Sequence, residues 1–341
     1  MTKPESAPVR IADVAKAAGV STATVSRVLG NSSHRVSADT QELVRATATT
    51  LGYRVNPIAR ALRLATTGSV GMVVPSIANP FFTELVEEVE HVLAADQVNL
   101  YLCDARNDPD VEARRLKSLS TGAVDGILVV PVHPHDSEPA VSAAAARVPV
   151  VQLDRQVMGL RIPWVGVEDR SGIRDLISHL AQVGVRSMVV FTSIQASVSA
   201  AIRTTEIQIQ AERCGIRLHE DDIFDLDLSL DAGTAGVDEV FEHRELPDAL
   251  VCVDDVLALG AISAFLRKRI RVPQDILVTG FDDIRYASVL SPTLTTVHQP
   301  LGRIAAEGVR LLADAESSKI GIQVALPGEL KIRESTSSGL Q

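Results

Sequence analysis

One face of a short helix predicted at residues 22–29 carries side chains suited to contacting another molecule. Apolar residues recur at helical spacing on the opposite face; they are Val25, Val28 and Leu29. The polar face presents Thr22, Ala23, Ser26 and Arg27. Hydroxyl and guanidinium groups can donate hydrogen bonds, and a guanidinium can donate two in parallel. We therefore treat this face as a candidate binding surface.

The charge around this helix is opposite to that of the remaining chain. Residues 1–66 contain nine Lys/Arg and four Asp/Glu, a net charge of +5, whereas the rest contains 24 basic and 39 acidic residues, a net charge of −15. A small basic segment on a large acidic body indicates that only the segment meets a polyanion. A chance fluctuation in charge is the alternative, and charge alone does not decide between the two.

Three short helices are predicted to position the polar face. Apolar spacing predicts the first over residues 11–18, with Gly19 as its stop and Ser21 as the cap of the second. Two helices of about two turns joined by such a turn form a helix-turn-helix. Ser37 and Gly52 bound a third helix. We expect one small core, built from Val14, Val25, Val28, Leu43, Val44 and Leu51.

A further helix is predicted directly after this head. Asn56 followed by Pro57 is typical of a helix start, and residues 58–64 then allow about two turns. Isolated helices this short are marginal in water. An ordinary linker helix, in which Leu62 packs on the body, is one interpretation of this segment.

A second group of polar residues follows short apolar runs in residues 69–341. Two series of such runs alternate with amphipathic stretches, which predicts an α/β fold with two Rossmann-like lobes of parallel sheet. Ligands bind at the carboxyl ends of strands in such sheets. The polar residues at those ends are Ser76, Asn79, Asp154, Arg155, Glu168, Asp169, Ser193, Asp254, Asp255 and Asp282. We expect them to converge on a cleft between the lobes.

Composition limits the class of protein. The length of 341 residues allows two or three domains, and 46% hydrophobic with 22% charged residues is ordinary for a globular chain. No apolar run reaches the length of a membrane span, and the N-terminus lacks the apolar core of a secretory signal. Three scattered cysteines argue against a disulfide framework. We expect a soluble, cytoplasmic protein with no membrane partner.

Several motifs together resemble the lactose- and purine-repressor family of bacterial transcription regulators. They are IADVAKAAGVSTATVSRVLGN, RVSADT, LGYRVNPIARALR, PSIANPFF, VDGILVVP, HLAQVGVRSMVV, VCVDDVLALGA and GFDDIRYASVLSPTLTTVHQP, in this order. The resemblance implies a helix-turn-helix head at 1–54, a hinge helix and linker at 55–68, and a two-lobed periplasmic-binding-protein-like body at 69–341. Lobe 1 would span about 69–168 plus 299–334, and lobe 2 about 169–298.

The resemblance also implies contacts with DNA. The second helix would lie in the major groove, where Arg27 can bond guanine and Ala23 and the Thr22 methyl suit thymine methyls. Leu62 would enter the central base step from the minor groove. The phosphate contacts would be Arg10, Ser21, Thr24, Ser26, Asn56, Arg60 and Arg63. Arg10 stands where the family usually has a capping Thr, and it cannot accept a capping hydrogen bond, so we expect a weaker helix start there.

An effector site between the lobes is the second implication. Arg203 matches the effector-contacting arginine of the family's S-A-x-x-R pattern, and Asp255 the aspartate of its A-N-D-x-x-A-L-G pattern. Weaker candidates are Asn79, Phe81, Arg155 and Asp282. A solvated helix charge and a helix cap are the respective alternatives for Arg203 and Asp255. We expect a small polar, sugar-like ligand.

The pattern departs from the family at the same site. Glu206 and Ile207 replace the usual Gly-aromatic pair, Asp254 replaces an Asn, and Leu228 stands where a stacking aromatic often lies. With only 3% aromatic residues, a ligand held mainly by ring stacking is disfavoured. A second carboxylate beside Asp255 could select a basic or hydroxyl-rich ligand.

An enzyme and a transport protein are the competing interpretations. Neither a dinucleotide G-x-G-x-x-G motif, a phosphate loop nor a nucleophile elbow follows a predicted strand. A His pair at 133 and 135 stands in a Pro-rich loop, which favours a chance pair over a metal site. An exported sugar-binding protein would need a signal peptide and leaves the basic head unexplained. We therefore expect no enzymatic activity, cofactor or metal, and a homodimeric repressor on a palindromic operator.

Overall fold

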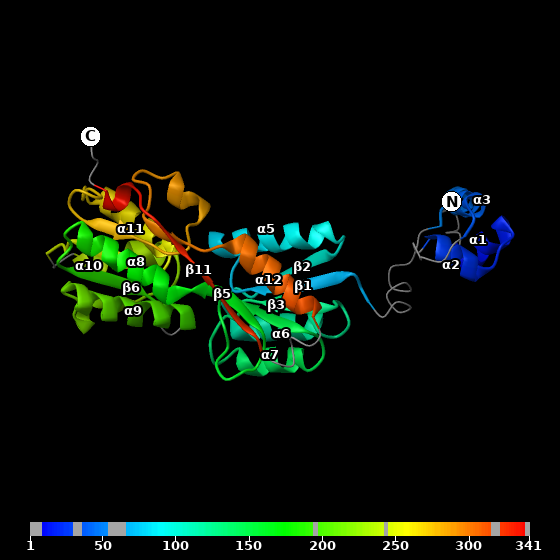
Figure 1. Ribbon diagram of the computed structural model, residues 1–341, viewed down its shortest axis with the longest axis horizontal. Helices are drawn as coiled ribbons and strands as arrows, with labels where there is room; N and C mark the ends of the chain where they lie inside the picture. The colour runs from blue at the N-terminus through cyan, green and yellow to red at the C-terminus, as the bar shows by residue number, and fades with distance from the viewer. Residues whose placement is uncertain are drawn as a thin grey trace, which may run out of the picture. The chain divides into compact units, whose positions relative to one another are not determined.

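The computed structural model describes residues 9–29, 36–53, 66–193, 197–241, 245–314 and 321–337. The chain divides into two compact units, Met1–Thr67 and Gly68–Gln341 (Figure 1). The predicted hinge helix falls within residues 54–65, which lie outside the described residues.

The head unit contains the three predicted helices. They are α1 (Ile11–Ala18), α2 (Thr22–Leu29) and α3 (Ala38–Leu51). Gly19 ends α1 with φ +66°, a left-handed conformation that favours glycine. The Ser21 hydroxyl accepts the backbone N–H of Thr24 at 3.1 Å at the start of α2. Local capping signals in the sequence thus define the helix-turn-helix.

The core of the head differs from the prediction at two positions. Val14, Val25, Val28 and Val44 are buried as expected, but Leu43 is 50% exposed and Leu51 is 37% exposed. The buried positions of α3 are Val44 and Ala48. One residue corresponds to about 100° of helix rotation, so the row that contains 43, 47 and 51 faces away from the row that packs on α1 and α2. Ala15, Ala18 and Ala48 complete the core instead.

Lobe 1 of the body is a parallel six-stranded sheet in the order β11-β5-β4-β3-β1-β2. The strands are β1 (Ser69–Val74), β2 (Asn99–Asp104), β3 (Gly126–Val129), β4 (Val150–Leu153), β5 (Trp164–Glu168) and β11 (Gln323–Pro327). Helices α5 (Pro80–Ala95) and α12 (Leu301–Ala313) share one core with the sheet. Helices α6 (Pro109–Leu119) and α7 (Glu138–Ala145) share another. The sheet is therefore covered on both faces (Figure 1), as buried parallel strands require.

Lobe 2 has a four-stranded parallel sheet in the order β7-β6-β8-β9. Its strands are β6 (Met188–Thr192), β7 (Ile223–Asp225), β8 (Ala249–Cys252) and β9 (Leu277–Thr279). Its helices are α8 (Asp169–Gln182), α9 (Val198–Cys214), α10 (Leu230–Phe241) and α11 (Asp255–Arg267). The backbones of α10 and α11 approach closely where Gly260 faces the Leu230 carbonyl oxygen. Strand-helix alternation in both lobes confirms the predicted α/β class.

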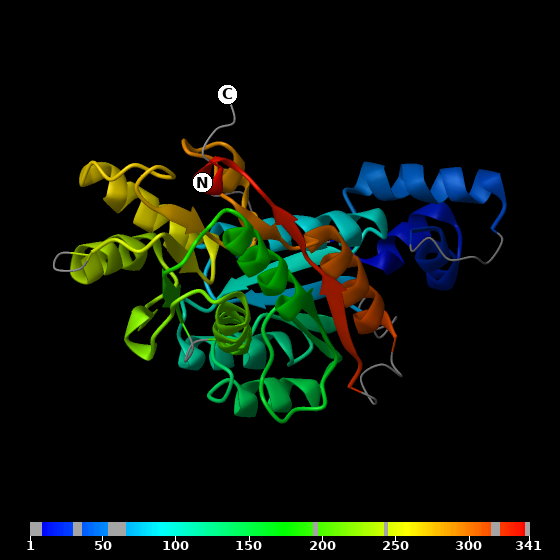
Figure 2. The same cartoon turned by 60° about the vertical axis from the view of Figure 1, so that its left-hand side comes forward.

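Over the described residues of the body, the chain crosses between the lobes three times. The first crossing joins β5 to α8, the second joins β10 (Thr296–His298) to α12, and the third joins β11 to β12 (Glu329–Lys331). Figure 2 shows the red β11–β12 segment running along the body across both lobes. Strand β12 pairs antiparallel with β10, and the Ser335 hydroxyl donates to the Val278 carbonyl at 2.6 Å. Residues 329–337 therefore return to lobe 2, so the predicted assignment of 299–334 to lobe 1 extends too far.

Among the described helices, none is both long and apolar enough to cross a membrane.

Candidate functional site

The outer face of α2 presents the residues that were predicted for base contact. Thr22, Ala23 and Arg27 are exposed, whereas Val25 and Val28 are buried on the inner face. The buried valines anchor α2 against α1 and α3, and this packing leaves the polar face open. On this face the Arg27 guanidinium can donate two parallel hydrogen bonds, and Thr22 and Ala23 present methyl groups.

The predicted phosphate contacts of the head lie on α2 and at the starts of α1 and α2. The Ser21 and Thr24 hydroxyl oxygens lie 2.9 Å apart, and Ser21 and Arg10 are exposed. Thr24 and Ser26 are half-buried. Three further contacts of the same class, Asn56, Arg60 and Arg63, lie outside the described residues, as does the proposed base-step residue Leu62.

The start of α1 is capped despite the arginine at its N-cap position. The Arg10 side chain has no acceptor, but the Asp13 carboxylate accepts the Arg10 backbone N–H at 2.8 Å. This bond is the reciprocal half of a capping box, and the negative charge also suits the helix N-terminus. The weak helix start predicted from Arg10 is therefore compensated by Asp13, a signal that the sequence contained three residues further on.

A cleft of about 850 Å³ lies between the two lobes of the body. Asn79, Phe82 and Arg155 line it from lobe 1, and Leu228 and Leu259 from lobe 2. The same cleft continues into an inner pocket of about 20 Å³, room for about one water molecule. Asn79, Phe81, Phe82, Asp154, Arg155, Ser197, Ser199, Ala200, Arg203, Leu228, Val253, Asp254 and Asp282 line this inner pocket. Five of the six predicted effector residues are thus together.

Arg203 is the central cation of the inner pocket. Its Nε donates to Asp169 Oδ1 at 2.7 Å, and its Nη1 donates to the Val253 carbonyl at 2.8 Å. Asp282 Oδ1 lies 3.5 Å from the same Nη1. The guanidinium also stacks on the Phe281 ring, 3.6 Å from its centroid. Arg203 therefore joins α9, α8, β8 and the loop after β9, and is not the solvated helix charge of the alternative interpretation.

Arg155 enters the pocket from the opposite lobe. Its Nη1 lies 3.4 Å from the Val132 carbonyl, and its guanidinium lies over the Phe82 ring at 5.2 Å from the centroid. Phe81 and Phe82 contact each other edge to face at 5.3 Å. The Asn79 side chain accepts the Phe81 backbone N–H at 3.0 Å and so caps α5. The lobe 1 wall consequently combines two aromatic rings with the cation of Arg155, the carboxyl group of Asp154 and the amide of Asn79.

The buried carboxyl groups around Arg203 have raised pKa values. Burial raises the pKa of Asp169 to about 6, although Arg203 opposes the shift, and burial likewise raises the pKa of Asp254 to about 6. Burial also raises the pKa of Asp154 and that of Asp282. It would lower the pKa of Arg203, but Asp169, Asp282 and Asp154 raise it above its usual value. The pocket is therefore an acidic environment with a strongly held cation.

Asp255 does not line the pocket, which corrects the prediction at this position. Its Oδ1 accepts the Thr296 hydroxyl at 2.6 Å and its Oδ2 accepts the Ile284 backbone N–H at 2.9 Å. The preceding residue, Asp254, caps α11 by accepting the Leu257 N–H at 2.8 Å and faces the pocket. Adjacent residues at the junction of a strand and a helix point in different directions. The residue that matches the family pattern, Asp255, is therefore the neighbour of the residue that lines the pocket, Asp254.

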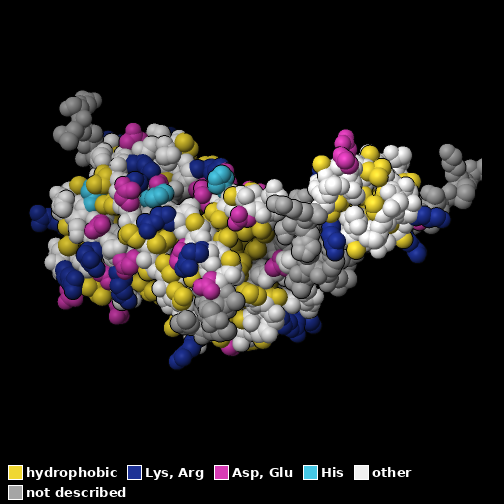
Figure 3. Space-filling view, turned by 45° about the vertical axis from the view of Figure 1, so that its right-hand side comes forward, with side chains coloured by type: hydrophobic (Ala, Val, Ile, Leu, Met, Phe, Trp, Pro, Cys, Tyr) yellow, Lys and Arg dark blue, Asp and Glu magenta, His cyan; other side chains and the backbone are white. Residues whose placement is uncertain are grey.

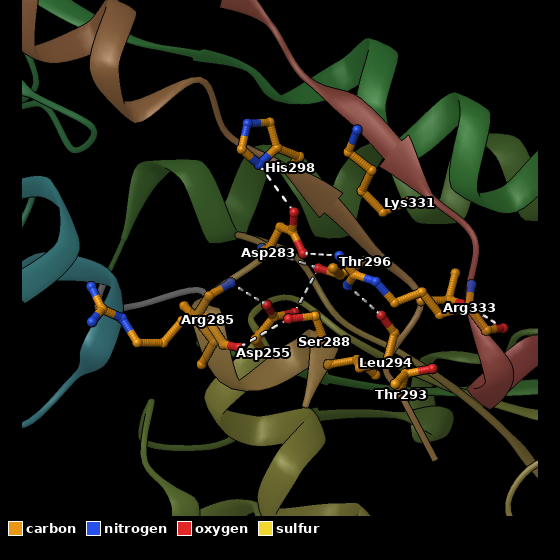
Figure 4. Close-up of polar contacts among 12 residues, drawn as sticks. Asp255, Asp283, Arg285, Ser288, Thr293, Leu294, Thr296, His298, Lys331 and Arg333 are labelled. Atoms are coloured by element: carbon orange, nitrogen blue, oxygen red, sulfur yellow. Dashed lines mark hydrogen bonds and ion pairs between the residues drawn. The ribbon is translucent and has the colours of Figure 1, made fainter. Parts of the chain in front are cut away.

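The loop at residues 282–285 links the pocket to several elements. Asp282 Oδ1 accepts the Gln299 amide at 2.8 Å, and Asp283 contacts His298 at 3.1 Å and Arg333 at 2.6 Å. Figure 4 shows Asp283 between His298 and Arg333, with Arg285 extending in the opposite direction. Arg285 contacts Glu84 at 3.2 Å and Glu87 at 2.6 Å on α5 of lobe 1. Sequence reasoning missed this inter-lobe ion pair because its partners are about 200 residues apart.

The comparisons with known proteins cover both units. Residues 10–56 match the family of bacterial regulatory proteins described as the lacI family, and residues 177–336 match a periplasmic binding protein-like domain. The HTH-type transcriptional repressor PurR of Haemophilus influenzae (strain PittEE) is 32% identical over 336 residues, covering 96% of this chain and 98% of that protein. PurR of Pasteurella multocida (strain Pm70) is 31% identical, covering 97% and 99%.

Solved structures of similar fold cover nearly the whole chain. The lac repressor dimer bound to operator and the anti-inducer ONPF has a TM-score of 0.86 at 26% identity, covering 97% of this chain and 100% of that one. A complex of the transcriptional regulator CelR with cellobiose has a TM-score of 0.71 at 27% identity, covering 96% and 99%. The fold and cleft define a two-lobed ligand-binding body with a helix-turn-helix head. The chain belongs to the lacI family of bacterial regulatory proteins, and it is a transcription regulator.

Proposed function

We propose that the chain represses transcription by binding a palindromic operator through the outer face of α2. The observation that carries the proposal is the open face of Thr22, Ala23 and Arg27, held outward by buried Val25 and Val28. The net charge of +5 over residues 1–66 supports a polyanionic partner for the head. The face of the body in Figure 3 carries acidic and basic side chains intermixed, which does not suit an extended phosphate backbone.

The proposed contacts divide into those that read bases and those that set position. Arg27 bonds guanine O6 and N7, and Thr22 and Ala23 contact thymine methyls. Hydroxyl groups and Arg10 fix the register through phosphates; the hydroxyl contacts are Ser21, Thr24 and Ser26. By resemblance to the family, Leu62 enters a pyrimidine–purine step at the operator centre, while Asn56, Arg60 and Arg63 contact phosphates.

A homodimer forms part of the proposal because a palindrome presents two equivalent half-sites. The similar lac repressor structure is a dimer on its operator. Edge strand β2 supports association, since Tyr101 and Leu102 are exposed on successive positions and hence on both faces. Val289 in lobe 2 is 72% exposed. Light scattering at micromolar concentration should give twice the chain mass, and a monomer or tetramer would contradict the proposal.

A small polar molecule in the inter-lobe cleft controls operator affinity in this proposal. Arg203, Asp282, Arg155, Asn79 and Phe81 line the inner pocket, and Asp254 takes the place first assigned to Asp255. A ligand that touches both lobes favours one relative orientation of the lobes. Coupling of about 1–3 kcal/mol, roughly 5- to 150-fold in affinity, is ordinary for such control.

A gel-shift assay with genomic DNA fragments tests the proposal directly. We expect a specific, salt-sensitive complex, and Arg27→Ala should relax base preference within a half-site by about 1–3 kcal/mol. Arg45→Ala is the matched control, because Arg45 is also an exposed arginine and lies on α3. It removes the same charge without altering the proposed reading face. Absence of any specific fragment would refute the operator proposal.

A second variant tests the hinge contact. Leu62→Ala should weaken binding to the operator and leave much of the nonspecific, salt-dependent binding, because a wedge acts on one base step. Equal loss of affinity on specific and nonspecific DNA would count against that role.

A further inference from the structure

The inner pocket of the cleft contains more buried acids than buried bases. Asp154, Asp254 and Asp282 line it, and Asp169 binds Arg203 beside it. All four are less than 8% exposed, and two buried arginines oppose them. Charges removed from water are unfavourable unless they are paired and hydrogen-bonded. Two carboxyl groups therefore exceed the available guanidinium charge, and their raised pKa values have the same cause, which is burial.

Asp254 is the carboxyl group of this cluster that has an oxygen without a hydrogen-bond donor. Its Oδ1 is occupied by the Leu257 N–H, whereas its Oδ2 is buried and has no hydrogen-bond partner among the described residues. The residue itself is 3% exposed and lines the inner pocket. One carboxylate oxygen is thus left without a hydrogen bond beside a space that has room for only a small group.

Neither arginine donates a hydrogen bond to that oxygen. Arg203 is committed to Asp169, to the Val253 carbonyl and to Asp282. Arg155 lies against the Val132 carbonyl and the Phe82 ring. A protonated amine is a compact donor of three hydrogen bonds and one positive charge, so it matches both the unpaired oxygen and the excess of acid.

We propose that the effector is a small hydroxylated molecule carrying a protonated amino group, which Asp254 Oδ2 binds in the inner pocket. This inference rests on the proposed effector control of the cleft. Hydroxyl groups of the ligand meet polar groups of the wider cleft such as Asn79 and Ser193. Anionic ligands, including sugar phosphates, are excluded because their charge would add to the acidic excess.

Matched pairs of probes test the amino group by itself. The pairs are D-glucosamine and D-glucose, D-galactosamine and D-galactose, and ethanolamine and ethylene glycol, each titrated calorimetrically into the full chain, with D-glucose 6-phosphate as the anionic probe. We expect at least one amine to bind roughly 30-fold or more tightly than its neutral twin, as for a buried charged hydrogen bond. Tighter or equal binding of the neutral twins or the phosphate, or no binding of any amine, would overturn the proposal.

The variant Asp254→Asn assigns the effect to one oxygen. Asparagine retains the Oδ1 acceptor that caps α11, so the fold should persist, which circular dichroism checks. Amine affinity should fall at least about 10-fold while affinity for the neutral twin stays the same. Asp227→Asn is the control: it removes an exposed carboxylate from the wider cleft and should change amine affinity less than about 2-fold because water screens it. Unchanged amine binding in Asp254→Asn refutes the assignment.

The gel-shift assay without ligand separates this inference from the function on which it rests. Specific DNA binding together with failed amine binding overturns only the ligand class. Failed DNA binding overturns the regulatory proposal whatever the titrations show.

Discussion

Replacing Arg203 by methionine should destabilise the body by leaving buried acids without their counter-charge. The substitution preserves side-chain length but removes the bond to Asp169 at 2.7 Å and the bond to the Val253 carbonyl at 2.8 Å. Removing one partner of a buried ion pair typically costs about 3–5 kcal/mol. We expect a loss in the free energy of unfolding of this size near neutral pH, and a smaller loss for Arg203→Lys, which retains the charge.

The loss should depend on pH with a definite sign. Asp169 has a folded pKa of about 6 against 3.8 for the ordinary group, so the folded state binds the proton more strongly. The contribution of Asp169 to the free energy of unfolding is therefore highest in acid. It falls by about 3 kcal/mol as the pH rises from 3.8 to about 6. Without Arg203 the folded pKa rises further. The deficit of the variant should thus be smaller at about pH 5 than at about pH 7.5.

Urea unfolding followed by fluorescence and circular dichroism measures both quantities. Trp164 is the single tryptophan of the chain, is 9% exposed and donates its indole N–H to the Asp154 carbonyl at 3.0 Å, so its emission reports on the body beside the pocket. Arg267→Met is the control, since exposed Arg267 contacts only Ser263 of its own helix among the described residues. A loss below about 1 kcal/mol for Arg203→Met, or an equal loss at both pH values, would refute the reasoning.

Three further predictions follow from the packing and surface contacts. Gly260→Ala should destabilise lobe 2 by about 1–3 kcal/mol despite a better helix propensity, because the added Cβ overlaps the Leu230 carbonyl of α10; unchanged urea unfolding would contradict this close approach. Leu43→Ser should change head stability by less than about 0.5 kcal/mol, whereas Val44→Ala should cost about 2 kcal/mol, because only Val44 is buried; thermal melts of the two variants decide. Arg285→Ala should lower body stability at low salt by removing the contacts with Glu84 and Glu87, and the difference from the wild type should shrink at high salt; a salt-independent difference would point to another cause.

Local signals in the sequence were sufficient to predict the helices of the head. Gly19, Ser21, Ser37 and Gly52 define helix ends through backbone conformation and capping bonds within a few residues, and such effects do not depend on distant parts of the chain. The alternating elements of the body were predictable for a similar reason, since apolar runs and amphipathic stretches follow the periods of strands and helices.

Tertiary structure decided which neighbouring residue does which task. Leu43 and Val44 are both apolar, and only the packing angle of α3 determines that Val44 is buried while Leu43 is exposed. Asp254 and Asp255 are identical in type, and their roles differ because Ile284 and Thr296, about 30 and 40 residues away, occupy both oxygens of Asp255. The sequence by itself determined that carboxylates follow strand β8. Only the folding of lobe 2 decided which carboxylate faces the cleft, because it brings the loop after β9 and strand β10 against Asp255.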